Sequence, residues 1–456
     1  MIKTLKNAFK IKDVRHRILF VLLMLVVVRL GSQLPLPGVN REFFQEFFES
    51  QGNDAFNLLD AFTGGSFSSM SIFALSITPY ITSSIIIQLL TIAIPKLEEM
   101  QRDGEDGRKK MTAITRYLTV GLALLQSTAM TIGFSNQSIN GVVLVEDLTV
   151  LKGITVVAGL TAGSAFLMWA GERINVNGVG NGISIVLLIN IISRIPSDFV
   201  TLYETFVKGR TIAKGGLAAV IILAIILVMI VFVLVLNGAT RKIPVQYSKK
   251  MVGRRMIGGQ SSSIPLKINT AGVMPIIFSS SIMSMPGMIL GFLGKSNIGG
   301  VGGEILATLS SSNWFNFSNP WYYQLGLVLY ILLTIFFAYF YTSITFNPLE
   351  VADNMKKQGG FIPGVRPGKP TVEYLNKILN YVIFIGAAGL VIVAVIPFFF
   401  NGMFRASVSF GGTSIIIIVG VVLDTIKKIE SQMLVRNYTG FLNNKGSNMS
   451  NSFLGY

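Results

Sequence analysis

The chain alternates long apolar runs with shorter polar segments. A transmembrane helix needs about 20 mostly apolar residues, and ten runs approach or reach that length. They lie at 18–37, 71–94, 115–134, 154–171, 182–196, 217–237, 270–291, 321–343, 376–398 and 409–427. The run at 182–196 is short for a span. This pattern predicts an all-α polytopic membrane protein with ten transmembrane helices.

The first run follows a basic segment that can mimic a secretory signal. Residues 1–17 contain six Lys and Arg. The run that begins at Ile18 is longer than a signal core, and no small-residue cleavage site follows it. We therefore expect an uncleaved first span that is preceded by a basic N-terminus.

Basic residues gather on alternate connections between the predicted spans. Residues 1–17, the connections after the second, fourth, sixth and eighth spans, and the C-terminal tail, counted together with the charged residues at the adjoining span ends, hold 29 of the 38 Lys and Arg but 12 of the 22 Asp and Glu. This side is expected in the cytoplasm, with both termini, because basic loops stay there. The exception on the other side is the segment after the fifth span, which contains Arg194, Lys208, Arg210 and Lys214.

Composition agrees with a membrane protein and narrows the chemistry. Hydrophobic residues make up 51% of the 456 positions and charged residues 13%, about half the charged fraction of soluble domains. With no cysteine and one histidine, His16, the chain lacks the ligands of Cys- or multi-His metal sites. No nucleotide-binding loop, carboxylate pair at membrane depth or Ser-Lys dyad is found, so we predict no enzyme, no metal and no cofactor.

Two long cytoplasmic connections have more positive charge than topology requires. The segment Gly238–Lys267 carries seven bases and no acid, and Asn347–Pro370 carries four bases among glycines and prolines. Long loops in compact proteins tend to be functional or disordered, and basic residues also simply fix topology. We favour docking of a large anionic partner. The candidate residues are Lys249, Lys250, Arg254, Arg255, Lys356, Lys357 and Arg366.

Two pairs of spans resemble each other across the chain. Pro79 and Pro275 are each followed by an isoleucine two residues later and by serines four and five residues later. Gly-rich segments with a serine, Gly180–Ser184 and Gly411–Ser414, precede the fifth and tenth spans. Chance similarity between Ile/Ser-rich helices is the alternative. The pattern favours two inverted five-helix halves, an arrangement that places the functional path at their interface.

A short apolar segment between the first two spans cannot cross a bilayer. Residues 54–65 would give a helix of about 15 Å, half of the hydrocarbon core. Phe56, Leu59 and Phe62 form an apolar stripe, whereas Asn57 and Asp60 oppose exposure to lipid. We expect a short helix folded back into the protein; an interfacial amphipathic helix is the alternative.

Charged residues are sparse inside the predicted spans. The span interiors offer Gln88, Gln126 and hydroxyl groups, and Arg29 and Asp424 lie near span ends, where side chains can snorkel. Ion-coupled transporters place ionisable residues near mid-membrane. A path through this chain is therefore expected to be lined and sealed by aliphatic side chains.

Several motifs together resemble the SecY/Sec61-alpha family of protein-translocation channels. They are Ser71–Leu90, Gly178–Ser184, Pro265–Gly272, Asn347–Asn354, Pro363–Gly368 and Phe410–Ser414. Ser76 stands where the family usually has glycine, and Leu349 where it often has arginine. The resemblance covers nearly the whole chain. It implies an hourglass channel with an aliphatic ring, a plug and a lateral gate to lipid.

The resemblance assigns residues to each of these parts. The pore ring would consist of Ile81, Ile85, Leu187, Ile191, Ile277 and Ile417, although ordinary core packing is the alternative for each. The plug would consist of Ala55, Phe56, Asn57, Leu58, Leu59, Asp60, Ala61, Phe62, Thr63, Gly64 and Gly65. Candidate polar contacts of the lateral gate are Gln88, Gln126 and Thr270, which instead could bond neighbouring backbone.

The implied function is translocation of unfolded secretory polypeptides across the bacterial cytoplasmic membrane, with sideways release of transmembrane segments into lipid. The implied partners are the SecE and SecG subunits, the SecA motor, the ribosome, signal peptides, unfolded preproteins and the bilayer. A secondary transporter of small solutes built on inverted repeats is the alternative.

The predicted organisation follows from these assignments. Residues 1–17 form the cytoplasmic N-terminus, 18–196 the first half with the plug at 54–65, 197–216 an external loop and 217–427 the second half. The second half contains cytoplasmic loops at 238–269 and 344–374, and residues 428–456 form a cytoplasmic tail.

Overall fold

The computed structural model describes most of the chain and divides it into two compact units. The described residues are 8–41, 43, 60, 63–135, 138–139, 142–143, 149–208, 212–247, 250–252, 255–257, 261–292, 300–315, 320–404 and 412–450. The first unit comprises Met1–Pro196, Met288–Asn297 and Val421–Tyr456, and the second comprises Ser197–Gly287 and Ile298–Gly420.

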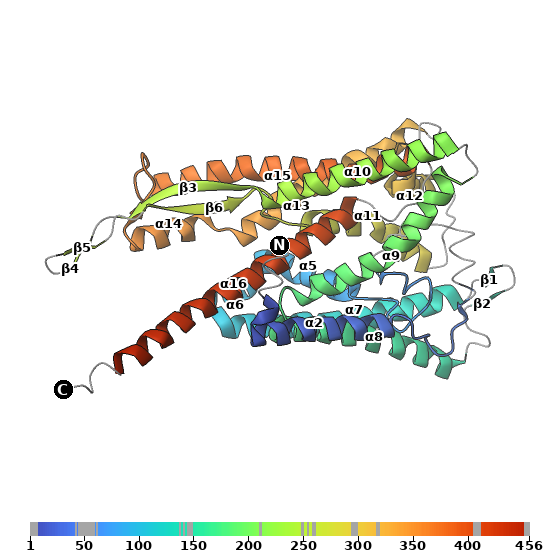
Figure 1. The fold of residues 1–456 in the computed structure, drawn as a ribbon. Coiled ribbons are helices and arrows are strands. Elements are labelled where there is room, and N and C mark those ends of the chain that lie inside the picture. The colour runs from blue at the N-terminus through green and yellow to red at the C-terminus, as the bar shows by residue number, and fades with distance from the viewer. Residues whose placement is uncertain are drawn as a thin grey trace. The chain divides into compact units, whose positions relative to one another are not determined.

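Helices make up most of the first unit. They are α2 (Lys12–Gly31), α5 (Thr78–Ala93), α6 (Pro95–Arg102), α7 (Gly104–Ser135), α8 (Val150–Asn177), the first part of α9 (Gly182–Phe206), and from Val421 onward α16 (Gly412–Ser450). α7 packs along both α5 and α8, and α2 packs on α8 (Figure 1). Strands β1 (Ser138–Ile139) and β2 (Val142–Val143) form a short antiparallel pair after α7.

The core of the first unit lies beneath the segment that precedes α5. Phe67 and Met70 of this segment are buried with Phe43, Phe134 and Leu160. Because α7 and α8 contribute Phe134 and Leu160, the segment between the predicted plug and α5 is held on a fixed helical support.

The second unit combines long helices with a small sheet. Its helices are the second part of α9, α10 (Ile212–Gly238), most of α11 (Met274–Phe292), α12 (Val301–Leu309), α13 (Gln324–Thr345), α14 (Pro348–Lys357), α15 (Lys369–Phe404) and the start of α16. Two 3₁₀ turns, η1 (Ser311–Asn313) and η2 (Trp321–Tyr323), separate α12 from α13. Trp314 is buried against Tyr330 and Phe398, which joins α13 to α15.

The two long basic connections fold together on one sheet. Strands β3 (Thr240–Tyr247) and β6 (Ser261–Lys267) pair antiparallel, and β7 (Gly360–Phe361) pairs with the other edge of β3. A separate hairpin of β4 (Lys250–Val252) and β5 (Arg255–Ile257) lies between β3 and β6 in sequence (Figure 1). Ile243, Leu266, Met355, Ile362 and Leu375 share one buried core. The two connections are therefore one structural module, which the sequence did not predict.

Local sequence explains where α14 of this module begins and ends. The side chain of Asn347 accepts a hydrogen bond from the Leu349 N–H at 3.1 Å, and Pro348 occupies the first turn. Both are favoured at a helix start. Lys356 and Lys357 occupy the last turn, where cations offset the helix dipole.

Six helices of the described residues are long and apolar enough to cross a membrane, and the bent pair α5–α6 would make a seventh. α11 is a shorter apolar helix. α2 and α16 occupy the first and tenth predicted spans, but α2 carries Arg15, Arg17 and Arg29, and α16 carries Asp424, Lys427 and Lys428. The structure is therefore consistent with the ten predicted spans, although length and composition identify only six or seven of them among the described residues.

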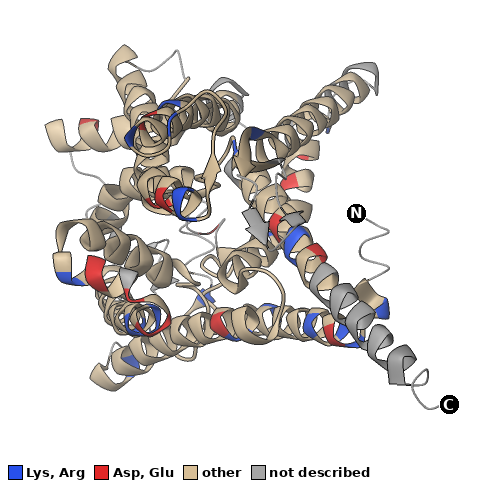
Figure 2. Cartoon of the chain, turned by 90° about the vertical axis from the view of Figure 1, so that its left-hand side faces the viewer, with Lys and Arg blue, Asp and Glu red and all other residues tan. Residues whose placement is uncertain are grey.

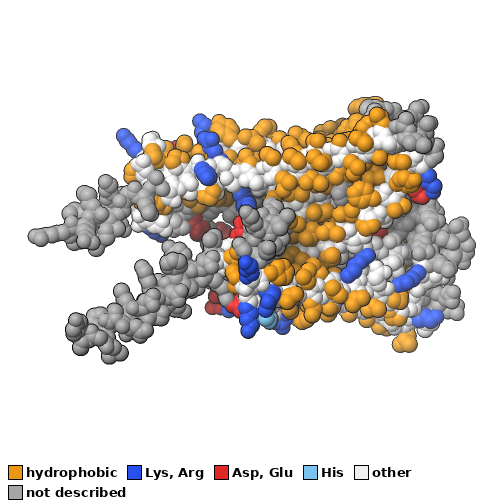
Figure 3. All heavy atoms as spheres, viewed as in Figure 1, with side chains coloured by type: hydrophobic (Ala, Val, Ile, Leu, Met, Phe, Trp, Pro, Cys, Tyr) orange, Lys and Arg blue, Asp and Glu red, His pale blue; other side chains and the backbone are white. Residues whose placement is uncertain are grey.

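The surface of the long helices is that of a membrane protein. In α10, the most apolar span, only 17% of the apolar window is buried. Exposed leucines and valines likewise follow α2, as the orange surface of these helices shows in Figure 3. Charged residues are sparse along the helical ribbons (Figure 2). Burying such side chains in lipid is favourable, whereas water would oppose their exposure.

Candidate channel-closing site

Both helices that carry the paired prolines start at those prolines. α5 begins at Thr78 and α11 at Met274, so Pro79 and Pro275 lie in the first turn rather than interrupting a helix. Their equivalent serines behave alike. Ser83 donates to the Pro79 carbonyl at 2.7 Å, and Ser279 donates to the Pro275 carbonyl at 2.8 Å. The two helix starts therefore agree with the paired positions in the sequence, whereas the same hydroxyl-to-carbonyl bond also occurs at other helical positions such as Thr91 and Thr119.

Four of the six predicted ring residues lie in the first unit, on two helices. Ile81 and Ile85 are half-buried on α5, and Leu187 and Ile191 are 6% and 4% exposed on α9. Each pair is spaced four residues apart, so each occupies a single face of its helix. Ile277 on α11 and Ile417 on α16 belong to the second unit, and both are buried.

The predicted plug is described at its C-terminal end. Ala55, Phe56, Asn57, Leu58, Leu59, Ala61 and Phe62 lie outside the described residues, whereas Asp60, Thr63, Gly64 and Gly65 lie within them. Asp60 and Thr63 are buried, with 3% and 1% exposure. We call Asp60 and Thr63–Ser69 the plug exit.

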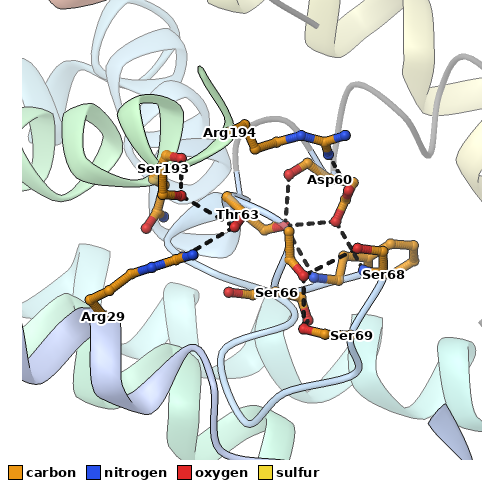
Figure 4. A network of polar contacts seen from close by, with 12 residues as sticks. Arg29, Asp60, Thr63, Ser66, Ser68, Ser69, Ser193 and Arg194 are labelled. Atoms are coloured by element: carbon orange, nitrogen blue, oxygen red, sulfur yellow. Dashed lines mark hydrogen bonds and ion pairs between the residues drawn. The ribbon is translucent and has the colours of Figure 1, made fainter. Parts of the chain in front are cut away.

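The carboxylate of Asp60 organises the plug exit. One of its oxygens, Oδ1, accepts the Ser68 N–H at 2.9 Å, and the other pairs with the Arg194 guanidinium of α9. The Thr63 hydroxyl donates to the Asp60 carbonyl at 3.1 Å and accepts the Phe67 N–H at 3.2 Å (Figure 4). A buried carboxylate requires such partners, because burying an unpaired charge is costly.

A glycine brings the plug exit into direct contact with α9. The carbonyl of Gly64 accepts hydrogen bonds from Arg29 of α2 at 3.2 Å and from the Ser193 hydroxyl of α9 at 3.3 Å (Figure 4). Gly64 has φ +69°, and a Cβ atom there would lie 2.7 Å from the Asn190 carbonyl oxygen. Both the conformation and the close approach therefore require glycine.

A second buried contact joins α9 to the segment before α5. Ser76 has φ +51°, in the left-handed region that favours glycine. Its hydroxyl accepts a hydrogen bond from the Asn190 amide at 3.1 Å, and both residues are buried. α9 thus contacts the plug exit and the start of α5 through residues adjacent to its two ring candidates.

Charges inside the first unit differ from the sequence expectation. Arg194 was assigned to an external loop and Arg29 to a snorkelling position, but both contact the plug exit. α9 continues to Phe206, well past the predicted span end at 196. In addition, Arg116 of α7 pairs with Glu172 of α8 at 2.7 Å. These residues lie at or near the ends of the predicted spans, so the expectation of sparse charge in the span interiors stands as a prediction. The sequence did not predict the pairing, because ion pairs between elements distant in sequence leave no local pattern.

The three lateral-gate candidates are distributed over both units. Gln88 of α5 and Gln126 of α7 are half-buried in the first unit, and α5 packs on α7. The side-chain carbonyl oxygen of Gln88 is buried and has no hydrogen-bond partner among the residues that the structure describes. Thr270 belongs to the second unit, where its hydroxyl donates to the Lys267 carbonyl at 2.6 Å.

The docking candidates lie on the module formed by the two basic connections. Lys356 and Lys357 of α14 and Arg366 after β7 are exposed. Lys250 and Arg255 belong to the β4–β5 hairpin, whereas Lys249 and Arg254 lie outside the described residues. Leu349, which stands where the related family often has arginine, is 58% exposed on α14.

Comparison with known proteins covers nearly the whole chain. A sequence profile of the SecY family matches residues 71–426. The protein translocase subunit SecY of Halalkalibacterium halodurans is 42% identical over 447 residues, covering 97% of this chain and all of the relative. The SecY subunits of Bacillus subtilis and Streptomyces galbus are 42% and 43% identical, with the same coverage.

Solved structures of similar fold include a protein-conducting channel, with a TM-score of 0.60, 16% identity and 92% coverage of both chains. Canine Sec61 in a ribosome–channel complex has a TM-score of 0.56, 15% identity and the same coverage. None of these comparisons supports the solute-transporter alternative. The chain belongs to the SecY family, whose members are channel subunits of protein translocases rather than enzymes.

Proposed function

We propose that this chain is the protein-conducting channel of a bacterial cytoplasmic membrane, which passes unfolded secretory polypeptides and releases transmembrane segments sideways into lipid. The observation that carries the proposal is the arrangement of the first unit. Two helices present paired aliphatic side chains, Ile81 and Ile85 on α5 and Leu187 and Ile191 on α9, and the predicted plug ends on one of these helices.

The aliphatic side chains serve as the seal. A narrow hydrophobic constriction dewets, which stops ions and water while it is closed. Aliphatic groups also offer no directional bonds, so they adapt to any polypeptide that passes. Ile277 and Ile417 complete the ring in this proposal, because they hold the repeat positions that match Ile81 and Leu187.

The plug, residues 55–65, adds a second barrier. The solved structures of similar fold include one described as a plug domain that stabilises the closed state of the translocation channel. In this chain the corresponding segment leads into a buried network anchored on α2 and α9. Asn57 and the apolar Phe56, Leu59 and Phe62 are proposed to occupy the closed path.

The lateral gate is proposed to open between the second and third spans on one side and the seventh and eighth on the other. Gln88, Gln126 and Thr270 would supply polar contacts that close it. An apolar signal sequence that leaves water for lipid through this opening gains hydrophobic free energy. That gain selects apolar segments without requiring a specific sequence.

Directional energy is proposed to come from partners on the cytoplasmic side. The basic residues of the shared module, Lys356, Lys357 and Arg366 together with Lys249, Lys250, Arg254 and Arg255, suit an anionic surface such as ribosomal RNA. Similar channels have been solved on ribosomes. SecA is the second proposed docking partner, SecE and SecG the proposed companion subunits, and both termini of the chain are cytoplasmic in this proposal.

Purification from membranes under mild conditions tests the class of protein. We expect a small single-span SecE-like subunit and SecA to co-purify with the chain, and the purified complex in proteoliposomes to transport a preprotein when SecA and ATP are supplied. Transport of a small solute, with no preprotein transport by a folded complex, would contradict the proposal.

A further inference from the structure

α9 contacts the plug exit and also carries two ring candidates, Leu187 and Ile191. Asn190 and Ser193 of α9 are three residues apart in sequence. In the same helix, Ile191 comes four residues after Leu187, and Arg194 comes three residues after Ile191. Residues three and four apart lie next to each other on a helix surface, so Leu187, Ile191 and Arg194 share one face of α9, and Asn190 and Ser193 lie beside that face. The polar face that holds the plug exit therefore adjoins the aliphatic face assigned to the seal.

The contacts on this polar face come from two separate parts of the chain. Arg194 pairs with Asp60, and the Ser193 hydroxyl donates to the Gly64 carbonyl at 3.3 Å. Asn190 donates to the Ser76 hydroxyl at 3.1 Å, two residues before the start of α5. One helix thus fastens both the plug exit and the beginning of the other ring-bearing helix of this unit.

Each of these contacts lies in a buried environment, so breaking it costs free energy. Asp60 and Asn190 are 3% exposed and Ser76 is 1% exposed, so their polar groups have no ready access to replacement water. A buried polar group that loses its partner keeps its full desolvation cost. Displacing α9 would break these contacts together, whereas local motion of α5 or the plug alone would break one set.

We propose that Ser76, Asn190, Arg194 and Asp60 are positioning residues that form a polar latch, through which α9 holds plug and seal closed together and sets the threshold for opening. This inference rests on the proposed channel function and adds to it a coupling between two barriers. Opening of the channel that displaces α9 from the start of α5 and from the plug exit breaks these polar contacts in one step, and it moves the helix that carries Leu187 and Ile191.

Ser76 offers a clean test because its backbone favours a different residue. Ser76→Gly removes the hydrogen bond to Asn190, which costs free energy, but it also relieves the positive φ, so the two effects oppose each other and the folded protein should remain close to wild type in stability. If Ser76 had a purely structural role, this substitution should not change the open fraction of the channel. If Ser76 is part of the latch, the open fraction should increase although the protein remains stable. We expect an ion leak about two- to tenfold above wild type, the range that one hydrogen bond represents in an equilibrium.

The matched control is Ser83→Ala in α5. Ser83 is also fully buried, but its hydroxyl bonds the Pro79 carbonyl within its own helix. Its removal should leave the leak at the wild-type level. The measurement is ion conductance of the complete complex in planar bilayers without substrate, together with export of a reporter that has a defective signal sequence, at matched protein level.

The ion pair is tested by a double-mutant cycle. Asp60→Asn and Arg194→Gln each preserve shape and remove one charge, and each should raise the leak. Because both break the same contact, the double variant should leak no more than the leakier single variant. Additive effects would show that the two residues act separately and would overturn the latch.

Different experimental outcomes would contradict the latch and the proposed channel function. A ring variant, Ile191→Asn, serves as the reference for opening. If Ile191→Asn leaks but Ser76→Gly remains at the wild-type level, or Ser83→Ala leaks as much as Ser76→Gly, the latch is wrong and the channel stands. If neither the ring variant nor wild type with a signal peptide conducts, the proposed function itself is wrong.

Discussion

Gly64 brings the plug exit into close contact with two other helices. It contacts α9 so closely that a side chain would collide with the backbone of Asn190, and its carbonyl receives two hydrogen bonds from other helices. The next residue, Gly65, also has a positive φ of +83°, but a Cβ atom there would meet no atom of the described residues within 4 Å. A comparison of substitutions at these two glycines therefore separates the effect of backbone conformation from the effect of close packing against α9.

We predict that Gly64→Ala raises ion leak much more than Gly65→Ala. Both substitutions place alanine at positive φ, which costs about 1 kcal/mol, but only Gly64→Ala pushes the plug exit away from α9. Conductance of the reconstituted complex and thermal stability measure the two effects. Equal leak in both variants would indicate that backbone strain alone, and not the contact with α9, explains the result.

At the residue scale, the sequence predicted apolar positions better than charged ones. Ile81 and Ile277 were matched through their prolines, and the helix starts and serine bonds of α5 and α11 agree with that pairing. Arg194 was instead assigned to a basic external loop. Its partner Asp60 lies 134 positions earlier, and no local spacing reveals a contact over that distance.

At the scale of elements, helix existence was predictable and element ends were not. α7, α8, α10 and α15 each contain a predicted span, and α13 covers the predicted span 321–343 except for its first three residues, which form η2. The second span instead starts as helix only at Thr78, after a segment of turns, and α9 runs through Pro196 to Phe206. Apolar composition identifies a span, but tertiary contacts such as Ser76 with Asn190 decide where its helix begins.

The plug is an element whose removal should be tolerated. We predict that deleting Asn57–Gly65 raises the ion conductance of the reconstituted channel while SecA-driven translocation survives, because the aliphatic ring can still close around a polypeptide. The deletion also removes Asp60 and the Gly64 carbonyl, so the leak should at least equal that of Asp60→Asn. Unchanged conductance in a folded deletion protein would count against the plug assignment.

At the scale of the whole molecule, the docking module joins parts distant in sequence. β3 and β6 come from one basic connection, β7 and α14 from the other, and a common core includes Leu375 of α15. This module is connected along the chain to two long helices, because α10 ends directly before β3 and α15 begins a few residues after β7. The sequence indicated the charge of these connections but not their shared sheet, because β7 contributes only two residues.

We predict that Arg366→Glu impairs partner-driven transport without destabilising the protein. Arg366 is exposed, and such substitutions usually change the free energy of unfolding by less than about 0.5 kcal/mol. Reversing its charge should nevertheless weaken binding to an anionic partner and strongly reduce SecA-driven translocation. Measurements of thermal stability, membrane insertion and translocation separate the two roles. A loss of stability that parallels the loss of transport would indicate a structural role.

The ring involves both units, so its test concerns the molecule as a whole. We predict that Ile417→Asn and Ile277→Asn each raise ion leak and allow export of substrates with defective signals. A polar side chain admits water to a dewetted constriction and stabilises open states that wild type reaches only with a signal sequence. If these isoleucines were ordinary core residues, each asparagine would instead cost about 1–3 kcal/mol and reduce export of every substrate.

Ile416 supplies the matched control for this test. It is 0% exposed and Ile417 is 2% exposed, so an asparagine at either position is equally buried, but the two side chains point in different directions from α16. Ile416→Asn should therefore lower protein stability without relaxing the signal requirement. The deciding measurement is export of a signal-defective reporter at matched protein level. If Ile417→Asn exports no more than wild type, or Ile416→Asn gains as much, the aliphatic side chain at 417 has no part in the seal.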